Sequence, residues 1–262
     1  MSTDEAATPP PVALTIAGFD PSGGAGVVAD IKTFTAFGCF ACAAVTSLTF
    51  QNTTGVFGAV HQTAEAVRAQ VLPVVEDFKV ACAKTGMLPT REVIREVARL
   101  FRETALPAPV VDPVARSTSG YDLIDDEALA ALVEELMPLA RVVTPNLPEA
   151  ERITKLQIRD EEGMRRAARA MRELGARAVL VKGGHLTGDA QDLLDDDGRV
   201  TVFRGERIQT TSTHGTGCTL AAAIAACLGK GMTLEDAVGA AKRFVAFRIR
   251  SAPGLGHGHG PI

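Results

Sequence analysis

The chain has 262 residues, 46% of them hydrophobic, and a formal net charge of −4 at pH 7. This hydrophobic fraction supplies a core for one large domain and excludes a largely disordered chain. The net negative charge, together with the lack of a concentrated basic stripe in the sequence, argues against a nucleic-acid partner. No apolar run reaches the roughly 18–20 residues that a membrane span needs, so no membrane partner is expected.

Two features of the bulk sequence predict a cytoplasmic protein. Residues 1–11 are acidic and proline-rich without a positive n-region, which predicts a disordered tail rather than a signal peptide. Cys39 and Cys42 form a lone C-x-x-C beside an apolar run, so core packing is the better interpretation than a redox or metal role. His257 and His259 lie in a glycine-rich tail with no partner ligands, so a metal site is not expected there either.

Apolar runs alternate with helical patterns along the whole chain. We expect strands over 12–17, 41–50, 56–61, 80–85, 109–111, 141–144 and 178–182, and a hairpin formed by 191–195 and 200–204. We expect helices over 26–37, 63–75, 90–103, 125–136, 148–154, 160–174, 220–228 and 234–251. This alternation predicts one α/β domain over 12–262, a three-layer α/β/α sandwich with a mostly parallel sheet of about eight or more strands.

Polar or charged residues lie at the ends of several of these strands. Gln51, Asp112 and Asn146 each come after an apolar run, and Lys182 ends another. Because the carboxyl ends of parallel strands meet at one edge of a sheet, these residues are expected to share a cleft.

The most distinctive stretch is 213–219, Thr-His-Gly-Thr-Gly-Cys-Thr, directly before an apolar helix. A glycine-containing helix start leaves N–H groups that bind anions, helped by the helix dipole. Cys218 falls in the first turn, where the pKa of a thiol is expected to be lowered. The stretch therefore predicts a phosphate-handling site with a cysteine at its centre.

A second glycine-rich turn, 18–26, follows the first strand. Its spacing is not G-x-G-x-x-G, and the chain contains no G-x-x-x-x-G-K-[ST], so neither a dinucleotide fingerprint nor a P-loop is present. A loop that lets a ligand approach the backbone is the favoured interpretation, and an ordinary turn is the alternative. Asp30 either faces the same pocket or is an exposed helix carboxylate.

The ordered motifs A-G-F-D-P-S-G-G-A-G, Q-N-T, K-T-G-M-L, D-P-V, T-P-N-L-P-E-A, V-K-G-G-H and T-H-G-T-G-C-T run from 17 to 219. Together they resemble the hydroxymethylpyrimidine/phosphomethylpyrimidine kinases of thiamine biosynthesis, in the ribokinase superfamily. The resemblance extends over about 12–261. It implies an ATP- and Mg²⁺-dependent enzyme, expected as a homodimer, that phosphorylates 4-amino-5-hydroxymethyl-2-methylpyrimidine and then its monophosphate.

The resemblance also implies roles for individual residues. The anion hole would comprise Gly215, Thr216, Gly217 and Cys218, with Cys218 as the proton acceptor. The substrate pocket would comprise Gly18, Asp30, Gln51, Met87, Val114 and Arg116. ATP would be bound by Asn146, Glu149, Lys182 and Thr213, and the metal ion by Asp112 and Glu149.

Two departures from the commoner family pattern stand out, Phe19 and the pair Ala115–Arg116. An arginine near the pocket is hypothesised to favour the monophosphate over the free alcohol. A pyridoxal kinase stays open as an alternative, because its substrate is also a flat nitrogen heterocycle with a hydroxymethyl group. The alternative of another class is a non-catalytic nucleotide-binding regulator.

Overall fold

The computed structural model describes residues 8–117, 120–184 and 190–262. The predicted N-terminal tail lies largely outside this part, and residues 8–11 have no regular secondary structure. His185, the last residue of the V-K-G-G-H motif, also lies outside the described residues.

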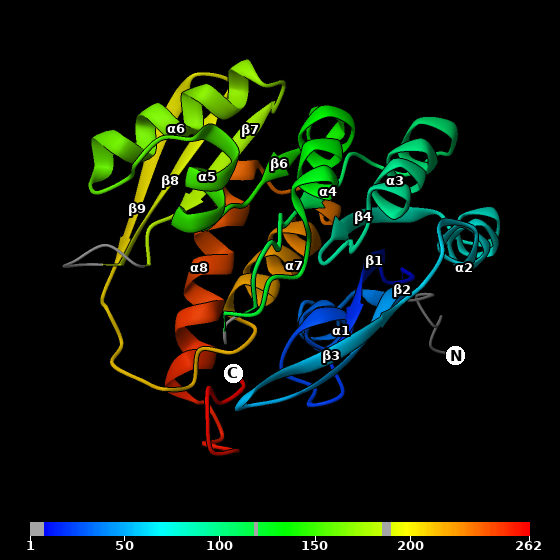
Figure 1. Cartoon of the computed structure of the whole chain (residues 1–262), viewed down its shortest axis with the longest axis horizontal. Coiled ribbons are helices and arrows are strands. Elements are labelled where there is room, and N and C mark those ends of the chain that lie inside the picture. Colours follow the sequence, from blue (N-terminus) through cyan, green and yellow to red (C-terminus); the bar gives the residue numbers. More distant parts are fainter. Residues whose placement is uncertain (1–7, 118–119, 185–189) are drawn as a thin grey trace, which may run out of the picture.

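A nine-stranded mixed sheet forms the middle of the molecule, in the order β3-β2-β1-β4-β5-β6-β7-β8-β9 (Figure 1). Strands β2, β1, β4, β5, β6 and β7 are parallel neighbours, and β3, β8 and β9 add antiparallel edges. The strands span Val12–Phe19 (β1), Phe40–Asn52 (β2), Gly55–His61 (β3), Val80–Thr85 (β4), Val110–Val111 (β5), Val142–Val143 (β6), Ala178–Lys182 (β7), Ala190–Asp196 (β8) and Arg199–Gly205 (β9).

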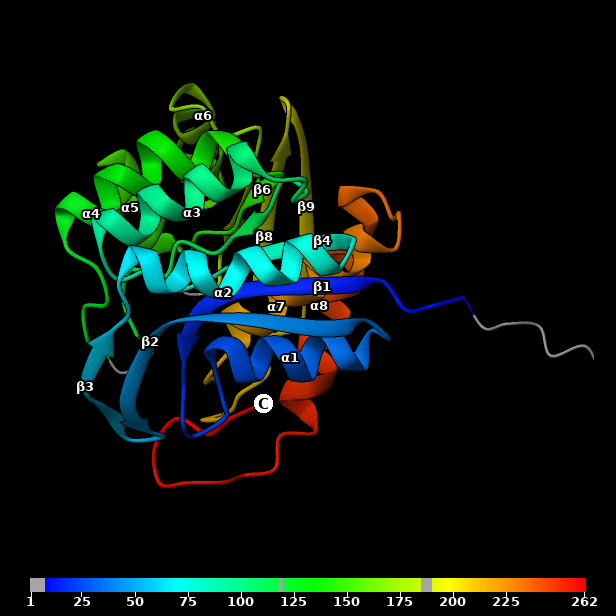
Figure 2. The same cartoon turned by 90° about the vertical axis from the view of Figure 1, so that its right-hand side faces the viewer.

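Helices cover both faces of the sheet, as the edge-on view of β1 and β2 between α2 and α1 shows (Figure 2). One face packs against Ala64–Asp77 (α2), Arg91–Glu103 (α3), Asp126–Ala131 (α4), Leu147–Thr154 (α5) and Glu161–Glu173 (α6). The other packs against Gly26–Ala36 (α1), Thr216–Gly229 (α7) and Leu234–Arg250 (α8). The expected three-layer α/β/α sandwich is therefore confirmed.

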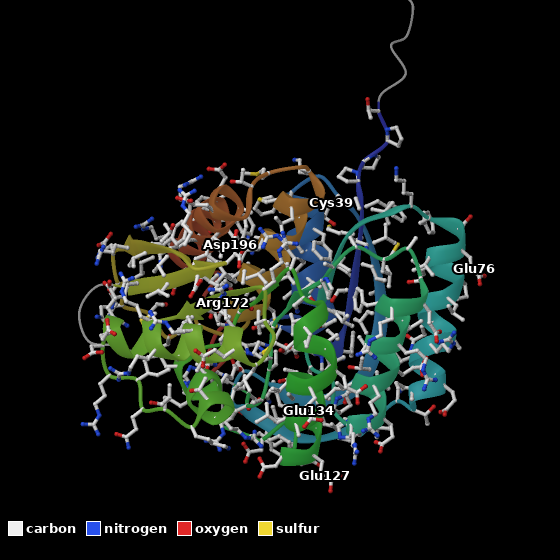
Figure 3. The ribbon with its side chains drawn as sticks, turned by 90° about the horizontal axis from the view of Figure 1, so that it is seen from above. Cys39, Glu76, Glu127, Glu134, Arg172 and Asp196 are labelled. Atoms are coloured by element: carbon white, nitrogen blue, oxygen red, sulfur yellow. The ribbon has the colours of Figure 1, made fainter. Side chains whose placement is uncertain are left out.

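The alternation of side chains along β1 explains why the core has two halves. Leu14 and Ile16 pack with the α2–α6 layer, whereas Ala13 packs with the α1, α7 and α8 layer. Thr15 points to the second layer as well, because its hydroxyl donates to Asp30 of α1. The apolar side chains thus fill both interlayer spaces, while charged side chains such as Glu76 and Glu127 lie on the outside (Figure 3).

The predicted elements are confirmed with three local corrections. The helix expected over 220–228 begins four residues earlier, at Thr216. Gln51 does not follow its strand but belongs to it, because β2 continues to Asn52 by pairing with β3 in a hairpin. The helix expected over 125–136 changes after Ala131 into a π-helical turn at Leu132–Leu136 and then a 3₁₀ turn, Met137–Leu139. Pro138 lacks the N–H that a continued helix requires.

Candidate active site

The carboxyl ends of the parallel strands open into a cavity of about 1620 Å³. Every residue that the sequence predicts for the site, except Asp30, lines this cavity. These are Gly18, Gln51, Met87, Asp112, Val114, Arg116, Asn146, Glu149, Lys182, Thr213, Gly215, Thr216, Gly217 and Cys218.

Asp112 and Lys182 form an ion pair on the cavity wall. Lys182 Nζ lies 2.9 Å from Asp112 Oδ1, and the Thr144 hydroxyl donates to the same oxygen at 3.1 Å. A Cβ added to Gly217 would lie 3.2 Å from Lys182 Nζ and 3.6 Å from Asp112 Oδ2. The start of α7 therefore lies directly against this charged pair.

Asn146 and Glu149 form a capping box at the start of α5. The Asn146 side chain accepts from the Glu149 N–H at 2.9 Å, and Glu149 Oε2 accepts from the Asn146 N–H at 2.8 Å. Burial raises the pKa of Glu149 to about 7 against the opposing charge of Lys182, and nearby Asp112 contributes to the increase. A buried carboxylate whose pKa is raised by a neighbouring carboxylate provides a place where a cation is favourable.

Metal binding here would rest on few protein ligands. In the part of the chain that the structure describes, no group of three or more His, Cys, Asp or Glu side chains has the arrangement of a metal site. Mg²⁺ in nucleotide enzymes is held by one or two carboxylates together with substrate phosphates and water. Asp112 and Glu149 supply that number of carboxylates, so the donor set fits magnesium.

Helix α7 begins beside the Asp112–Lys182 pair with Gly215 as its N-cap and no side-chain cap. The Thr216 N–H bonds to Thr213 O at 3.4 Å. Among the described residues, the N–H groups of Gly217 and Cys218 have no hydrogen-bond partner. Unpaired N–H groups at the positive end of a helix dipole form the anion site that the sequence predicts.

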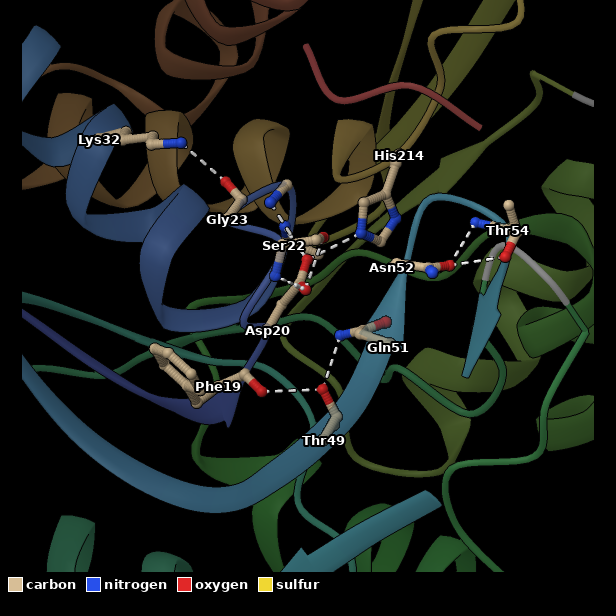
Figure 4. A network of polar contacts seen from close by, with 12 residues as sticks. Phe19, Asp20, Ser22, Gly23, Lys32, Thr49, Gln51, Asn52, Thr54 and His214 are labelled. Carbon is tan, nitrogen blue, oxygen red and sulfur yellow. Dashed lines mark hydrogen bonds and ion pairs between the residues drawn. The ribbon is translucent and has the colours of Figure 1, made fainter. Parts of the chain in front are cut away.

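The two glycine-rich turns interlock beside this helix start, around Asp20 (Figure 4). The buried Asp20 carboxylate accepts from the N–H groups of Gly24 and Ala25, from Ser22, and from His214 Nε2 at 2.8 Å. A Cβ on Gly24 would overlap the His214 ring. The first turn therefore holds the second one in position.

Cys218 lies where these elements meet, in the first turn of α7 and on the cavity wall. The expectation that its pKa is lowered is wrong for this structure, because burial raises the pKa of the thiol to about 11. Lys84 lowers the pKa of the thiol, but Asp30 and Asp112 oppose it. The helix start alone does not offset the loss of water around the sulfur.

Gln51 lies at another part of the wall with its amide held in place. Its Nε2 donates to Thr49 Oγ1 at 2.8 Å, and that hydroxyl donates to Phe19 O at 2.9 Å (Figure 4). Among the described residues, the Gln51 carbonyl oxygen has no donor. Met87 packs over Gly18, where an added Cβ would lie 3.0 Å from its sulfur. This part of the wall therefore combines apolar surface with one amide oxygen that has no donor among the described residues.

The structure places one charged residue, Asp30, differently from both sequence-based alternatives, a side chain that faces the pocket and an exposed helix carboxylate. Asp30 is fully buried, and its carboxylate pairs with Lys84 instead of lining the cavity. Sequence reasoning missed Lys84, although a lysine within the apolar run of β4 was a visible signal. Arg116 lies at the cavity mouth and pairs with Asp122 at 2.8 Å.

Comparison with solved structures first defines the class. A Bacillus subtilis pyridoxal kinase, solved as an ADP complex, superposes with a TM-score of 0.88 at 36% identity, covering 96% of both chains. A phosphomethylpyrimidine kinase from Clostridium difficile gives a TM-score of 0.81 at 38% identity, covering 91% of this chain and 99% of that one. The fold and the site thus define a ribokinase-like kinase.

Sequence comparison then gives the family. The family model described as phosphomethylpyrimidine kinase matches residues 20–262. A hydroxymethylpyrimidine/phosphomethylpyrimidine kinase of Streptomyces coelicolor is 46% identical over 253 residues, which are 97% of this chain and 94% of the relative. The bifunctional thiamine biosynthesis protein ThiED of Geobacter sulfurreducens is 48% identical, and the chain spans about half (51%) of its length. The chain belongs to the phosphomethylpyrimidine kinase family.

Among the described helices, none combines the length and the apolar character that crossing a membrane requires.

Proposed function

We propose that this kinase transfers the γ-phosphoryl group of ATP to the hydroxymethyl group of 4-amino-5-hydroxymethyl-2-methylpyrimidine, and a second one to the resulting monophosphate. One observation carries the proposal. The unpaired N–H groups at the start of α7 lie against the Asp112–Lys182 pair and line the same cavity as Gln51. A phosphoryl group held there is in reach of both substrates.

The nucleotide side of the reaction uses the charged wall. Asn146, Glu149, Lys182 and Thr213 are assigned to the phosphates of ATP, with Lys182 as the cation nearest the helix start. Asp112 and Glu149 would hold Mg²⁺, which neutralises charge on the phosphates when bound. Gly217, without a side chain, lets the transferring group approach the backbone N–H groups.

The acceptor side uses Gln51 and the apolar wall. The free carbonyl oxygen of Gln51 can accept from the amino group of an aminopyrimidine, because its Nε2 is already committed to Thr49. Gly18, Met87 and Val114 then contact the faces of the ring. Asp30, which stays beneath the surface, is excluded from direct contact by its burial.

Cys218 is the proposed proton acceptor for the first phosphorylation. The step uses the thiolate form of Cys218, a minor form near neutral pH because burial raises the pKa of the thiol to about 11. As the alcohol oxygen bonds to phosphorus and the bond to the ADP oxygen breaks, the hydroxyl proton moves to the thiolate, and the resulting thiol later returns this proton to solvent. The second phosphorylation differs, because a phosphate monoester at pH 7 is already largely ionised and has no such proton to lose. Cys218 is therefore expected to matter more for the alcohol than for the monophosphate.

Arg116 is proposed to favour the monophosphate. It lies at the mouth of the cavity, where its guanidinium can leave Asp122 and contact a substrate phosphate. Measuring kcat/KM for both substrates in wild type and Arg116→Ala tests this. A selective loss for the monophosphate supports the role, and an equal loss for both contradicts it.

The homodimer is a further proposal, supported by an apolar face on the β2–β3 hairpin. Leu48, Phe50, Phe57 and Val60 are 42%, 52%, 69% and 52% exposed. A group of four exposed apolar side chains at the edge of a sheet favours association with a second copy of the chain. The sedimentation of wild type and of Phe57→Asp tests this proposal. A wild-type dimer that becomes a monomer in Phe57→Asp supports it, and a wild type that sediments as a monomer contradicts it.

All five cysteines are free thiols, which supports the proposed cytoplasmic compartment.

Pyridoxal kinase is kept as a second candidate because of the structural similarity to a pyridoxal kinase. ADP release from ATP-Mg²⁺ is measured separately with the pyrimidine alcohol, its monophosphate and pyridoxal. Turnover with both pyrimidines supports the proposal, turnover with pyridoxal alone supports the second candidate, and no turnover with any acceptor supports a regulator.

A further inference from the structure

The glycine-rich segment after α8 lies against the active site. Residues 256–261, here called the clasp, lie beside the tip of the β2–β3 hairpin (Figures 1 and 2). Three successive N–H groups of the clasp donate to Thr53 in the hairpin turn. The Thr53 hydroxyl accepts from His257 at 3.2 Å and from Gly258 at 3.3 Å. The Thr53 carbonyl oxygen accepts from His259 at 2.8 Å, so the clasp is attached to the hairpin through its backbone.

The clasp is also attached to the turn that precedes α7. The Gly260 carbonyl oxygen accepts the N–H of His214 at 3.0 Å, and His214 also forms a parallel β-bridge with the clasp. Thr213 Oγ1 lies 3.3 Å from His259 Nδ1, and both residues line the cavity. The clasp therefore joins two walls of the active site, the hairpin that carries Gln51 and the turn that leads into the anion site.

Two glycines of the clasp are accounted for by the closeness of these contacts. A Cβ on Gly258 would overlap the carbonyl oxygen of Thr53, and a Cβ on Gly260 would lie 2.8 Å from the Ser212 hydroxyl. Neither glycine has a positive φ, so the backbone conformation alone would accept alanine at both. Of the two contacts, the one at Gly258 is with backbone, which cannot rotate away as a serine hydroxyl can. Glycine is therefore needed at 258 for the clasp to reach the hairpin.

The clasp completes a closed ring of contacts around one part of the cavity. On β2, the Thr49 hydroxyl donates to Phe19 O at 2.9 Å (Figure 4). The next residue, Asp20, bonds to His214 Nε2 at 2.8 Å. His214 is bonded to the clasp, and the clasp is bonded to Thr53, which follows β2. A closed ring limits the motion of its members, because none of them can hinge away without breaking a contact.

The two walls differ in how well they are held without the clasp. Every residue of α7 from Thr219 to Cys227 is buried, so the helix is fixed by its packing. Strand β3 is at the edge of the sheet and pairs with β2 on one side. A two-stranded hairpin is only marginally stable by itself, so the contacts at its tip decide where the tip lies. The hairpin is therefore the wall whose position depends on the clasp.

We propose that the clasp is a positioning element that fixes Gln51 at its working distance from the start of α7, so that the acceptor is aligned with the phosphoryl group. The proposal rests on the proposed function in that Gln51 binds the acceptor. Transfer between two bound substrates is sensitive to alignment, and a misplacement of about 1 Å can cost about 100-fold in rate. The clasp therefore acts on the acceptor rather than on the nucleotide, whose phosphates are assigned to the wall formed by Asp112 and Lys182.

Hydrogen exchange in the protein without substrates tests the clasp itself. Gly258→Ala places a Cβ against the Thr53 carbonyl oxygen, and Thr53→Val removes the hydroxyl that accepts two N–H groups of the clasp. In both variants we expect the amide of His214, which donates to the clasp, to exchange at least about tenfold faster. Mass spectrometry of peptides that contain residue 214 measures this rate at a site distant in sequence from both substitutions.

Two matched substitutions are the controls. Gly254→Ala introduces a methyl group in the same segment at a φ of +64°, but its Cβ would meet no atom within 4 Å. Thr54→Val removes the neighbouring hydroxyl, which donates to the Asn52 side chain within the hairpin turn. Both controls are expected to leave the exchange rate of the His214 amide unchanged. If Gly258→Ala fails to fold, Thr53→Val decides the test, because valine keeps the size of the side chain.

Steady-state kinetics then tests the positioning role. In Gly258→Ala and Thr53→Val we expect kcat/KM for the pyrimidine alcohol to fall by about tenfold or more, while KM for ATP changes by less than about twofold. Unchanged exchange at residue 214 in both variants overturns the clasp, and an equal change in the parameters for acceptor and ATP overturns its positioning role. Because the exchange assay contains neither ATP nor pyrimidine, a failure of the clasp is distinguishable from a failure of the proposed reaction.

Discussion

His214 Nε2 lies 2.8 Å from the buried carboxylate of Asp20, and this contact joins two turns that are 194 residues apart. The first turn surrounds the start of α1, and the second forms the start of α7. Cys218 and the anion-binding N–H groups lie where the two turns meet, so the geometry of the site depends on this contact.

Replacing Asp20 tests that dependence. Asp20→Asn keeps the size of the side chain but loses the charge and one acceptor oxygen, and it leaves donors of the turn unsatisfied. We expect the free energy of unfolding to fall by about 1–3 kcal/mol and kcat to fall by at least about tenfold. Urea unfolding and ADP release measure the two effects. Asp77→Asn, an exposed change on α2, is the control, and equal behaviour of the two variants would contradict the role.

The same residue predicts a pH dependence of stability. Burial raises the pKa of Asp20, but the hydrogen bonds from His214 and Ser22 outweigh burial, and the pKa is lowered. A lowered folded-state pKa stabilises the fold above the unfolded value, about 3.9, and that stabilisation is lost as the pH falls through the folded-state value. The difference in unfolding free energy between wild type and Asp20→Asn should therefore shrink from pH 5 toward pH 2. A difference that is constant over this range contradicts the prediction.

Gly215 and Gly231 form a matched pair of glycines, both with φ of +83°. A Cβ on Gly215 would overlap the carbonyl oxygen of Gly24, whereas a Cβ on Gly231 would meet no atom within 4 Å. Gly231→Ala is expected to cost about 1 kcal/mol of backbone strain and to leave kcat unchanged.

Gly215→Ala carries the same backbone strain and also separates the two turns. We expect kcat to fall by about 100-fold, because the N–H groups at the start of α7 move. Steady-state kinetics and thermal unfolding of both variants make the comparison. Similar kcat values for the two would show that the interlocked turns do not hold the anion site.

Lys182 is expected to act on the nucleotide. Lys182→Met removes the cation nearest the start of α7 and leaves Asp112 with the Thr144 hydroxyl alone. We expect kcat/KM for ATP to fall by about 100-fold, while binding of the pyrimidine changes little. Lys230→Met is the control, since Lys230 is exposed, does not line the cavity, and donates to the carbonyl of Phe37. An equal loss of pyrimidine affinity would contradict the assignment.

The fold was predictable from the sequence because its signals are local. Each apolar run and each helix start is encoded in adjacent residues, and Thr63, Thr90 and Asp160 cap their helices as side-chain acceptors. The order of the strands was not predictable, since it depends on contacts between distant segments. The continuation of β2 through Gln51 was not predictable either, because the strand is extended there by its pairing with β3.

The positions of site residues were predictable where those residues follow strands or begin helices. The placement and the pKa of a side chain were not predictable where they depend on burial or on a buried partner. Asp112, Asn146 and Lys182 line the cavity as expected from their positions at the sheet edge. The pKa of Cys218 was predicted in the wrong direction, since the helix start is visible in the sequence but the burial is not. Asp30 was placed on the correct helix, yet its pairing with Lys84 links residues that are 54 positions apart.

Comparing wild type with Cys218→Ala on both acceptors tests the account most directly. ADP release is measured with ATP-Mg²⁺ and either the pyrimidine alcohol or its monophosphate. We predict that wild type uses both, and that Cys218→Ala loses about 100-fold in kcat with the alcohol but much less with the monophosphate. An equal loss with both acceptors, or no loss with the alcohol, would contradict Cys218 as the proton acceptor.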